Sequence, residues 1–110
     1  MTVQELAGRL GWELLAGEGG CGREVDGCYV GDLLSWVMSR AQAGNVWLTV
    51  MGNINAIAVA SLTDSACIVL TESAALDAEA RARADQQEIP VYTTGKNSYE
   101  TALAVAEALG

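Results

Sequence analysis

Two short apolar runs flank a segment of helix length in the middle of the chain. Residues 46–50 (VWLTV) and 66–70 (ACIVL) are rich in β-branched side chains, which is typical of buried strands. Between them, residues 54–62 carry only Asn55 and Ser61 as polar positions, so this helix is apolar almost all round. The pattern predicts a strand–helix–strand unit whose helix is covered by the sheet on one side and by further protein, from this chain or a second copy, on the other.

The N-terminal part of the chain repeats this alternation of helix and strand. Thr2 and Glu5 have the spacing of a capping box and predict a helix that Gly11 ends. A strand over residues 12–16 and an extended piece over residues 23–30 follow. Asp32 is then expected to cap a helix whose inner face carries Leu34, Val37, Met38 and Ala41.

The C-terminal part predicts a helix over residues 76–88, a strand over residues 89–93 and a closing helix. Pro90 places that strand at an edge of the sheet or makes it the first strand position. The closing helix is expected to turn Tyr99, Ala102, Leu103 and Ala106 inward. Strands alternating with helices indicate an α/β fold, and we expect one domain over residues 1–110 with a mainly parallel sheet covered on both faces.

The composition excludes several classes of protein. The formal net charge is −8, and six cations are too few to form the basic stripe that a phosphate backbone requires, so we expect no nucleic-acid partner. No apolar run reaches the length of a membrane span, and the opening MTVQELAGRL lacks a basic region followed by an apolar core. The sequence therefore predicts a cytoplasmic protein with no membrane association.

Several segments resemble one known family, the DRTGG domain, which is itself similar to the N-terminal domain of HPr kinase/phosphorylase. The segments are residues 23–35 (REVDGCYVGDLLS), 46–50 (VWLTV), 53–62 (NINAIAVASL), 89–91 (IPV) and Thr93. The stretch that names the family would follow Leu70, where this chain reads TESAA and lacks Asp-Arg-Thr-Gly-Gly.

The resemblance implies a compact three-layer α/β/α sandwich. Members of the family usually occur as accessory modules beside kinase, CBS or phosphotransacetylase domains. The resemblance therefore implies a regulatory or dimerising module, not a reaction.

The residues themselves offer little for catalysis, so we expect no enzyme activity. The stretch TGKNS at residues 94–98 is not a Walker A loop, because position 90 is proline and Asn97, not Ser or Thr, follows the lysine. The chain has no histidine, so a Ser-His or Cys-His nucleophile is excluded. Asp26 and Asp32 could act as a carboxylate pair, but a turn residue and a helix cap explain them better.

A binding site is the better hypothesis for the loops that follow the strands. In open parallel sheets, ligands sit beyond the carboxyl ends of the strands, where helix N-termini offer free amides. These loops carry small hydroxyls, amides, glycines and the only lysine, which suit a small anionic or polar ligand. The candidate residues are Gly52, Asn53, Thr71, Ser73, Thr94, Gly95, Lys96 and Ser98.

The three cysteines do not predict a metal site or a cofactor. Cys67 lies inside a predicted strand and is expected in the core. Cys21 and Cys28 lack CxxC spacing and histidine helpers, so two unconnected thiols are expected, although they could pair under oxidation.

Self-association is predicted from the second apolar face of the central helix. Ala56 and Ala60 would permit close approach there, and Trp36 and Met38 on a nearby helix would extend the patch, so we expect a homodimer. The sequence thus predicts a stand-alone, non-catalytic regulatory module that senses a small anionic metabolite or contacts a partner enzyme. A scaffold subunit without ligand, or a small enzyme acting at the loops on the carboxyl edge, are the alternatives.

Overall fold

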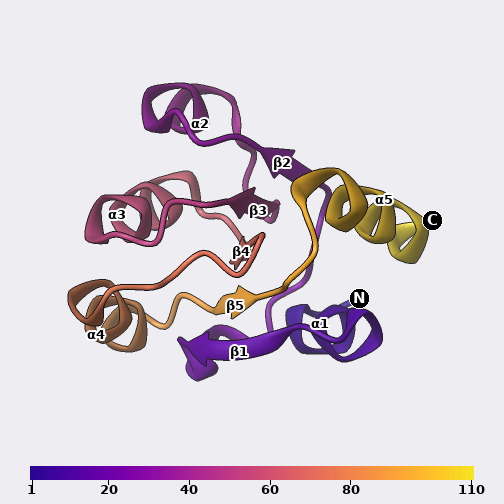
Figure 1. Cartoon of the computed structure of the whole chain (residues 1–110), viewed down its shortest axis with the longest axis horizontal. Coiled ribbons are helices and arrows are strands. Elements are labelled where there is room, and N and C mark those ends of the chain that lie inside the picture. The colour runs from indigo at the N-terminus through magenta and orange to yellow at the C-terminus, as the bar shows by residue number, and fades with distance from the viewer.

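Five strands form a single mixed sheet in the order β1-β5-β4-β3-β2 (Figure 1). A computed structural model describes residues 1–110. Strands β2 to β5 run parallel to one another, and β1 pairs antiparallel to β5. The strands are β1 (Glu13–Ala16), β2 (Cys28–Val30), β3 (Val46–Thr49), β4 (Cys67–Leu70) and β5 (Val91–Thr93).

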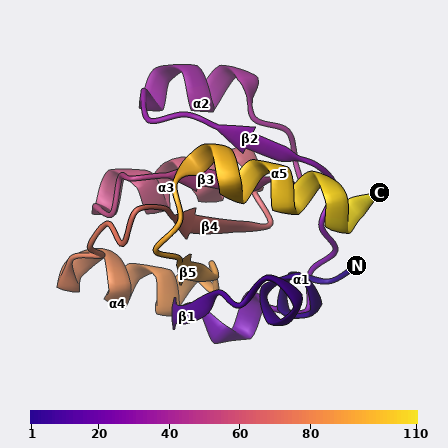
Figure 2. The ribbon, with the colours of Figure 1, turned by 45° about the vertical axis from the view of Figure 1, so that its right-hand side comes forward.

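Helices cover both faces of this sheet, which confirms the three-layer α/β/α sandwich (Figures 1 and 2). Three of them, α2 (Leu34–Arg40), α3 (Ile54–Thr63) and α4 (Ala78–Gln87), connect consecutive parallel strands and lie side by side on one face. The other face is covered by α1 (Val3–Leu10) and α5 (Ser98–Leu109), with α5 over β2 and β3. The strands β2 to β5 follow one another across the sheet in one direction, and their crossover connections have the same handedness. Helices α2, α3 and α4 therefore lie on the same face. A short 3₁₀ helix, Glu18–Gly20, follows β1. None of the helices is both long and apolar enough to cross a membrane.

The alternation of side chains along β3 and β4 joins the two halves of the core. Trp47, Ile68 and Leu70 face α2, α3 and α4, whereas Val46, Leu48, Cys67 and Val69 face α1 and α5. All eight residues of these two strands are buried. The two apolar runs are therefore central strands, as the sequence predicted.

The cover over α3 comes from this chain. Its neighbours α2 and α4 flank it within the same layer (Figure 1). Ala56, Ile57, Val59 and Ala60 are buried among them and the sheet, while Leu62 remains 72% exposed. Contacts within this chain thus bury most of the apolar surface of this helix.

Both ends of α1 lie where the sequence predicts them, whereas the start of α2 does not. The Thr2–Glu5 capping box starts α1, and Gly11 ends it in the left-handed conformation at φ 75°. Asp32 is not the cap of α2, because the helix begins one residue later with Leu33 at the cap position. The Asp32 carboxylate instead accepts hydrogen bonds from Thr49 Oγ1 at 2.7 Å and Val50 N at 3.0 Å, which tie the loop after β2 to the end of β3.

Two expectations about inward faces were wrong, and so was one of the two alternatives given for the strand at Pro90. Met38 is exposed on α2 rather than turned inward. On α5 the inner positions are Thr101 and Val105, and Tyr99 is 72% exposed. Helix α5 is apolar at most positions, so periodicity alone could not identify its inner face, and the Thr101 hydroxyl is compatible with burial because it donates to the Asn97 carbonyl. Strand β5 lies between β1 and β4 rather than at an edge, and Pro90 precedes it.

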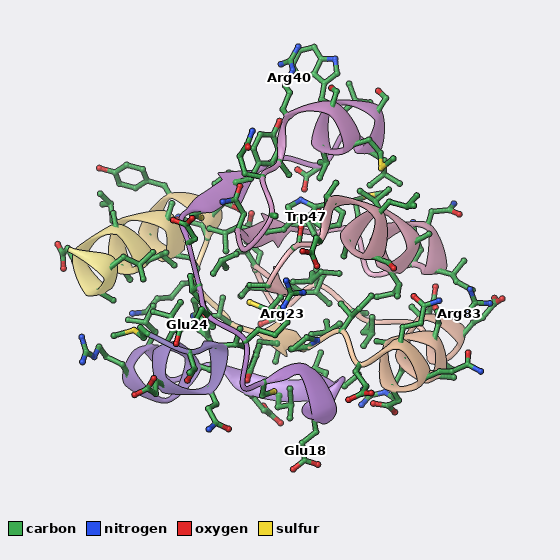
Figure 3. The ribbon with its side chains drawn as sticks, turned by 180° about the vertical axis from the view of Figure 1, so that it is seen from behind. Glu18, Arg23, Glu24, Arg40, Trp47 and Arg83 are labelled. Atoms are coloured by element: carbon green, nitrogen blue, oxygen red, sulfur yellow. The ribbon has the colours of Figure 1, made fainter.

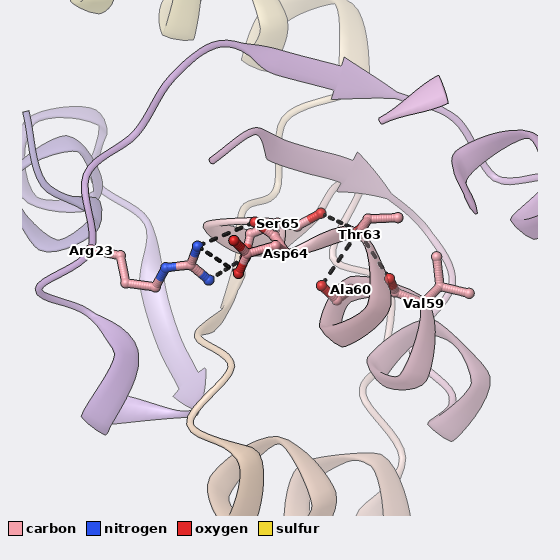
Figure 4. Close-up of polar contacts among 6 residues, drawn as sticks. All are labelled: Arg23, Val59, Ala60, Thr63, Asp64 and Ser65. Atoms are coloured by element: carbon pink, nitrogen blue, oxygen red, sulfur yellow. Dashed lines mark hydrogen bonds and ion pairs between the residues drawn. The ribbon is translucent and has the colours of Figure 1, made fainter. Parts of the chain in front are cut away.

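Arg23 connects the N-terminal segment to the end of α3 (Figure 4). Its guanidinium donates to the Ser65 carbonyl at 2.9 Å, the Asp64 carbonyl at 3.2 Å and the Asp64 carboxylate at 2.9 Å. On the other side of this turn, Thr63 Oγ1 donates to the Val59 carbonyl and lies 2.8 Å from Ser65 Oγ. These bonds satisfy carbonyls at the turn between α3 and β4.

We predict that Arg23→Met lowers the free energy of unfolding by about 1–2 kcal/mol, because hydrogen bonds from a charged donor to backbone carbonyls are lost. Asp64→Gly removes only the ion pair, which is exposed and therefore weak, and glycine suits the φ of 55° at this position. We expect Asp64→Gly to change stability by less than about 0.5 kcal/mol. Urea denaturation of both variants tests this, and equal losses would show that the ion pair, not the carbonyl contacts, carries the effect.

Candidate functional site

The loops that follow β3, β4 and β5 gather at one edge of the sheet, because these strands are parallel. They comprise residues 50–53, 71–77 and 94–97. All eight residues predicted to bind a ligand lie in these loops or at the first position of the following helix. How closely the loops approach one another decides which of the eight can act together.

The loops after β4 and β5 are hydrogen-bonded to each other. Thr71 Oγ1 lies 2.9 Å from Ser98 Oγ, and the amides of Glu72 and Ser73 donate to the carbonyls of Lys96 and Thr94 at 2.8 and 2.9 Å. Across this junction, a Cβ on Gly95 would lie 3.5 Å from Ser73 Oγ. The structure therefore brings together six predicted residues: Thr71, Ser73, Thr94, Gly95, Lys96 and Ser98.

Gly52 and Asn53 belong to a different contact. The Gly52 carbonyl accepts from the amide of Asp77, and a Cβ on Gly52 would lie only 1.9 Å from the carbonyl oxygen of Ala75. Asn53 caps α3 by accepting from the amide of Ala56 at 3.0 Å. The loop after β3 therefore packs on the far part of the loop after β4, away from the Thr71–Ser98 pair.

The six residues that come together differ in their exposure to solvent. Thr71 is fully buried and its hydroxyl is bonded to Ser98. Ser73, Gly95 and Lys96 are exposed to solvent, and Lys96 is the only lysine of the chain. The partly buried hydroxyl pair holds the two loops, while Lys96 and Ser73 can contact a molecule in solution.

Side chains of the protein already cap the helices that begin at this edge. Asn53 caps α3, Asp77 accepts from the Ala80 amide of α4 at 2.8 Å, and Asn97 forms a capping box with Glu100 on α5. From the sequence, we expect these helix N-termini to offer free amides to an anion. The caps occupy part of that capacity, so the Lys96 ammonium is the main positive group at this edge.

Two consecutive residues of the loop after β4 adopt the left-handed conformation. Glu72 has a φ of 56° and Ser73 a φ of 55°, a region that residues with a Cβ adopt at a cost of roughly 1–2 kcal/mol each. Their amides make the two bonds to the loop after β5. Sequence reasoning did not identify this turn, because neither residue is glycine or asparagine.

The model of the DRTGG domain matches residues 5–108. The chain belongs to the DRTGG domain family. The further similarity of this chain to the N-terminal domain of HPr kinase/phosphorylase is not tested by this match and stays a prediction. A search of the curated proteins found no match.

Among solved structures, the chain is similar to the CBS and DRTGG domains of the regulatory region of a Clostridium perfringens pyrophosphatase. That structure is a complex with the activator diadenosine tetraphosphate. The TM-score is 0.70 at 14% sequence identity, and the match covers 94% of this chain and 45% of that chain. The likeness shows the fold, and this DRTGG chain spans less than half of the region it resembles.

The left-handed turn coincides with the stretch that names the family. The chain reads TESAA at residues 71–75, where the family resemblance places Asp-Arg-Thr-Gly-Gly, so the turn contains no glycine. Glycine adopts positive φ without steric cost. Glu72 and Ser73 carry a Cβ, so this DRTGG domain adopts the turn at a steric cost that glycine would avoid.

The four residues predicted for a dimer interface separate into two groups. Trp36 and Met38 are exposed on α2, at 52% and 43%. Ala56 and Ala60 are buried inside the protomer and cannot meet a second copy, so this part of the prediction was wrong. The reason is that α2 and α4 cover the sides of α3.

The two aspartates considered as a catalytic pair lie apart. Asp26 precedes β2 and Asp32 follows it, so they stand at opposite ends of that strand. Asp32 is engaged with Thr49 and Val50. The prediction that Asp32 caps a helix was wrong, but its contacts are structural.

The three cysteines are unpaired thiols on the α1 and α5 side of the sheet. Cys21 Sγ lies 3.1 Å from Tyr92 OH within the core. Burial raises the pKa of the Cys28 thiol to about 11 and raises the pKa of Cys67 further. Burial and then the hydrogen bond with Cys21 raise the pKa of Tyr92. All of these shifts favour the neutral forms, so these groups are poor nucleophiles at neutral pH.

We predict that Gly52→Ala destabilises the protein by about 2–3 kcal/mol, because the new methyl group would overlap the Ala75 carbonyl and displace the loop after β4. Gly8→Ala is the control: nothing lies within 4 Å of its Cβ position in α1, and alanine should stabilise that helix by about 0.5–1 kcal/mol. Chemical denaturation measures both. A Gly52→Ala variant as stable as the natural protein would contradict the close packing of the two loops.

We also predict slow alkylation of Cys28 in the folded protein. With its pKa raised to about 11, the thiolate fraction at pH 8 falls by roughly two orders of magnitude relative to an ordinary thiol. The rate with iodoacetamide should rise about tenfold per pH unit until the pH approaches that pKa. Mass spectrometry identifies the alkylated residue, with Cys28→Ser as the control. Rapid labelling of Cys28 at pH 8 under native conditions would contradict the prediction.

Proposed function

We propose that this DRTGG domain is a non-catalytic regulatory module that works as a homodimer and binds a small anionic metabolite at the loops after β4 and β5. Family membership and the likeness to a domain within the regulatory region of a pyrophosphatase support a regulatory role. One observation carries the ligand proposal: the single lysine is exposed on the loop after β5, which a partly buried hydroxyl pair and backbone hydrogen bonds hold against the loop after β4.

The charge of the chain makes this position distinctive. The formal net charge is −8, so most of the surface repels an anion. Lys96 supplies a positive group where Ser73 and Thr94 add hydroxyls, and Gly95 adds no side chain of its own. Phosphate and carboxylate groups accept hydrogen bonds from ammonium and hydroxyl groups, so a ligand carrying one or two such groups fits best.

The site is suited to binding rather than to turnover. The Thr71 and Ser98 hydroxyls bond to each other, and the chain contains no histidine that could serve as a base. Three unpaired thiols are consistent with a cytoplasmic location, where thiols stay reduced.

A scaffold without ligand is the second candidate. The caps on α3, α4 and α5 favour it, because side chains of the protein occupy amides that an anion would otherwise use. In that case the module acts through a protein partner, and small molecules leave its stability unchanged.

A thermal-shift assay tests the proposal with ATP, AMP and diadenosine tetraphosphate as probes. A ligand at about a hundred times its dissociation constant stabilises by roughly 2.7 kcal/mol, which raises the melting temperature of a domain of this size by several degrees. We expect at least one probe to produce such a shift and Lys96→Ala to lose most of it.

Arg83→Ala is the matched control, because it removes one exposed cation from α4 and leaves the edge loops intact. It should keep the full shift. If no probe raises the melting temperature of the wild-type protein, the scaffold is favoured. If Lys96→Ala keeps the full rise in melting temperature, this lysine is not part of the binding site.

A further inference from the structure

The charges of this acidic chain are unevenly distributed. Residues 27–63, which form β2, α2, β3 and α3, contain only two charged side chains, Asp32 and Arg40. These two cancel, so the whole formal net charge of −8 lies on the rest of the protein. Two copies that met through most other faces would bring carboxylates together, whereas this region imposes no such repulsion.

The same region is apolar on its surface. Six of the nine exposed large hydrophobic residues lie within it: Val30, Leu33, Trp36, Met38, Val50 and Leu62. Helix α2 forms one extremity of the molecule, and Figure 3 shows Arg40 on its outer side, far from Glu18 at the opposite end. Apolar and neutral surface is therefore concentrated around α2 and the edge strand β2.

One side of α2 carries a stripe of exposed residues. Leu33, Trp36 and Arg40 follow one another at helical spacing, with Leu33 57% and Trp36 52% exposed, while Val37 on the inner side is fully buried. The Arg40 guanidinium stacks over the Trp36 ring, 3.9 Å from its centroid. Stacking uses the face of the guanidinium and leaves the N–H groups at its edge able to bind a carboxylate.

Arg40 is the last residue of α2, and Asp32 lies in the loop before the helix, two residues ahead of its first residue. Asp32 and Arg40 each lie four positions from Trp36. When two such segments pack antiparallel across a twofold axis at Trp36, the loop that carries Asp32 in each copy comes near the end of α2 that carries Arg40 in the other. Both intramolecular hydrogen bonds of Asp32 go to Oδ1, so Oδ2 remains to accept from a second copy.

We infer that the homodimer forms by antiparallel packing of α2 on α2 of a second copy, with the two Trp36 side chains at the twofold axis and Arg40 of each copy beside Asp32 of the other. This inference rests on the proposed homodimer and identifies its interface. Trp and Arg are the residues most enriched where interface energy is concentrated.

The other exposed apolar helix fits a second copy less well. Helix α5 presents Tyr99 and Leu103, but its charged residues are Glu100 and Glu107 and it carries no cation. Pairing α5 with its copy would oppose like charges. A strongly basic partner protein would be drawn to the acidic remainder of the surface, not to the neutral α2 region.

Charge reversal at Arg40 tests the interface. We expect Arg40→Glu to raise the dimer dissociation constant by roughly tenfold or more, measured by sedimentation velocity over a concentration series, because each attraction becomes a repulsion. Arg83→Glu on α4 makes the same change in net charge away from α2 and should leave the constant within about twofold of wild type. Figure 3 shows the positions of both arginines.

Cysteine cross-linking provides a second measurement. Trp36→Cys places a thiol at the twofold axis and should form a covalent dimer under mild oxidation, whereas Leu62→Cys, on α3 and 72% exposed in the natural protein, should not. Suppose that the wild-type protein is a dimer, that Arg40→Glu and Arg83→Glu weaken it equally, and that position 36 shows no preferential cross-link. These results would overturn the α2 interface but leave the proposed homodimer intact. A wild-type protein that stays monomeric at high concentration removes both, while the ligand response tests the regulatory role separately.

Discussion

Strands β3 and β4 are covered on both faces, and no side chain of either strand reaches water. Each successive side chain enters the opposite helix layer, so the two strands fasten α2, α3 and α4 to α1 and α5 through one sheet. Burial of apolar area on this scale is the main stabilising contribution to such a domain. The position of each edge loop depends on these strands, because the loops begin where the buried strands end.

The carboxyl edge is held by polar contacts that the core alone could not provide. The Thr71–Ser98 hydroxyl pair and the amides of Glu72 and Ser73 join two loops that are distant in sequence. That junction uses two left-handed residues, and neither of them is a glycine. Retention of a costly backbone at this point is consistent with a role for its geometry, since strained backbone tends to occur where function requires it.

The surface of the protein has two distinct parts. The candidate ligand loops bring a lone cation to an acidic protein, whereas α2 offers an apolar and neutral face. The two features serve the two parts of the proposed function, binding and self-association. They lie on different elements, so variants at Lys96 and at Arg40 should act independently, as expected for residues without shared contacts.

The sequence by itself determined the elements and the class of fold. Apolar runs predicted β3 and β4, and a capping box predicted the start of α1, because these are local signals of period and hydrogen bonding. The alternation of strands and helices predicted the sandwich. Most ligand-loop residues also come together as predicted, since parallel strands direct their ends to one edge.

Only the tertiary structure decided which sides of the apolar helices face inward. Ala56 and Ala60 are buried because α2 and α4 flank α3, and α5 turns Thr101 and Val105 inward rather than Tyr99 and Leu103. A helix that is apolar all round has no periodic signal to orient it. The role of Asp32 and the left-handed turn at Glu72 and Ser73 also depend on partners from other strands and loops, which no local pattern encodes.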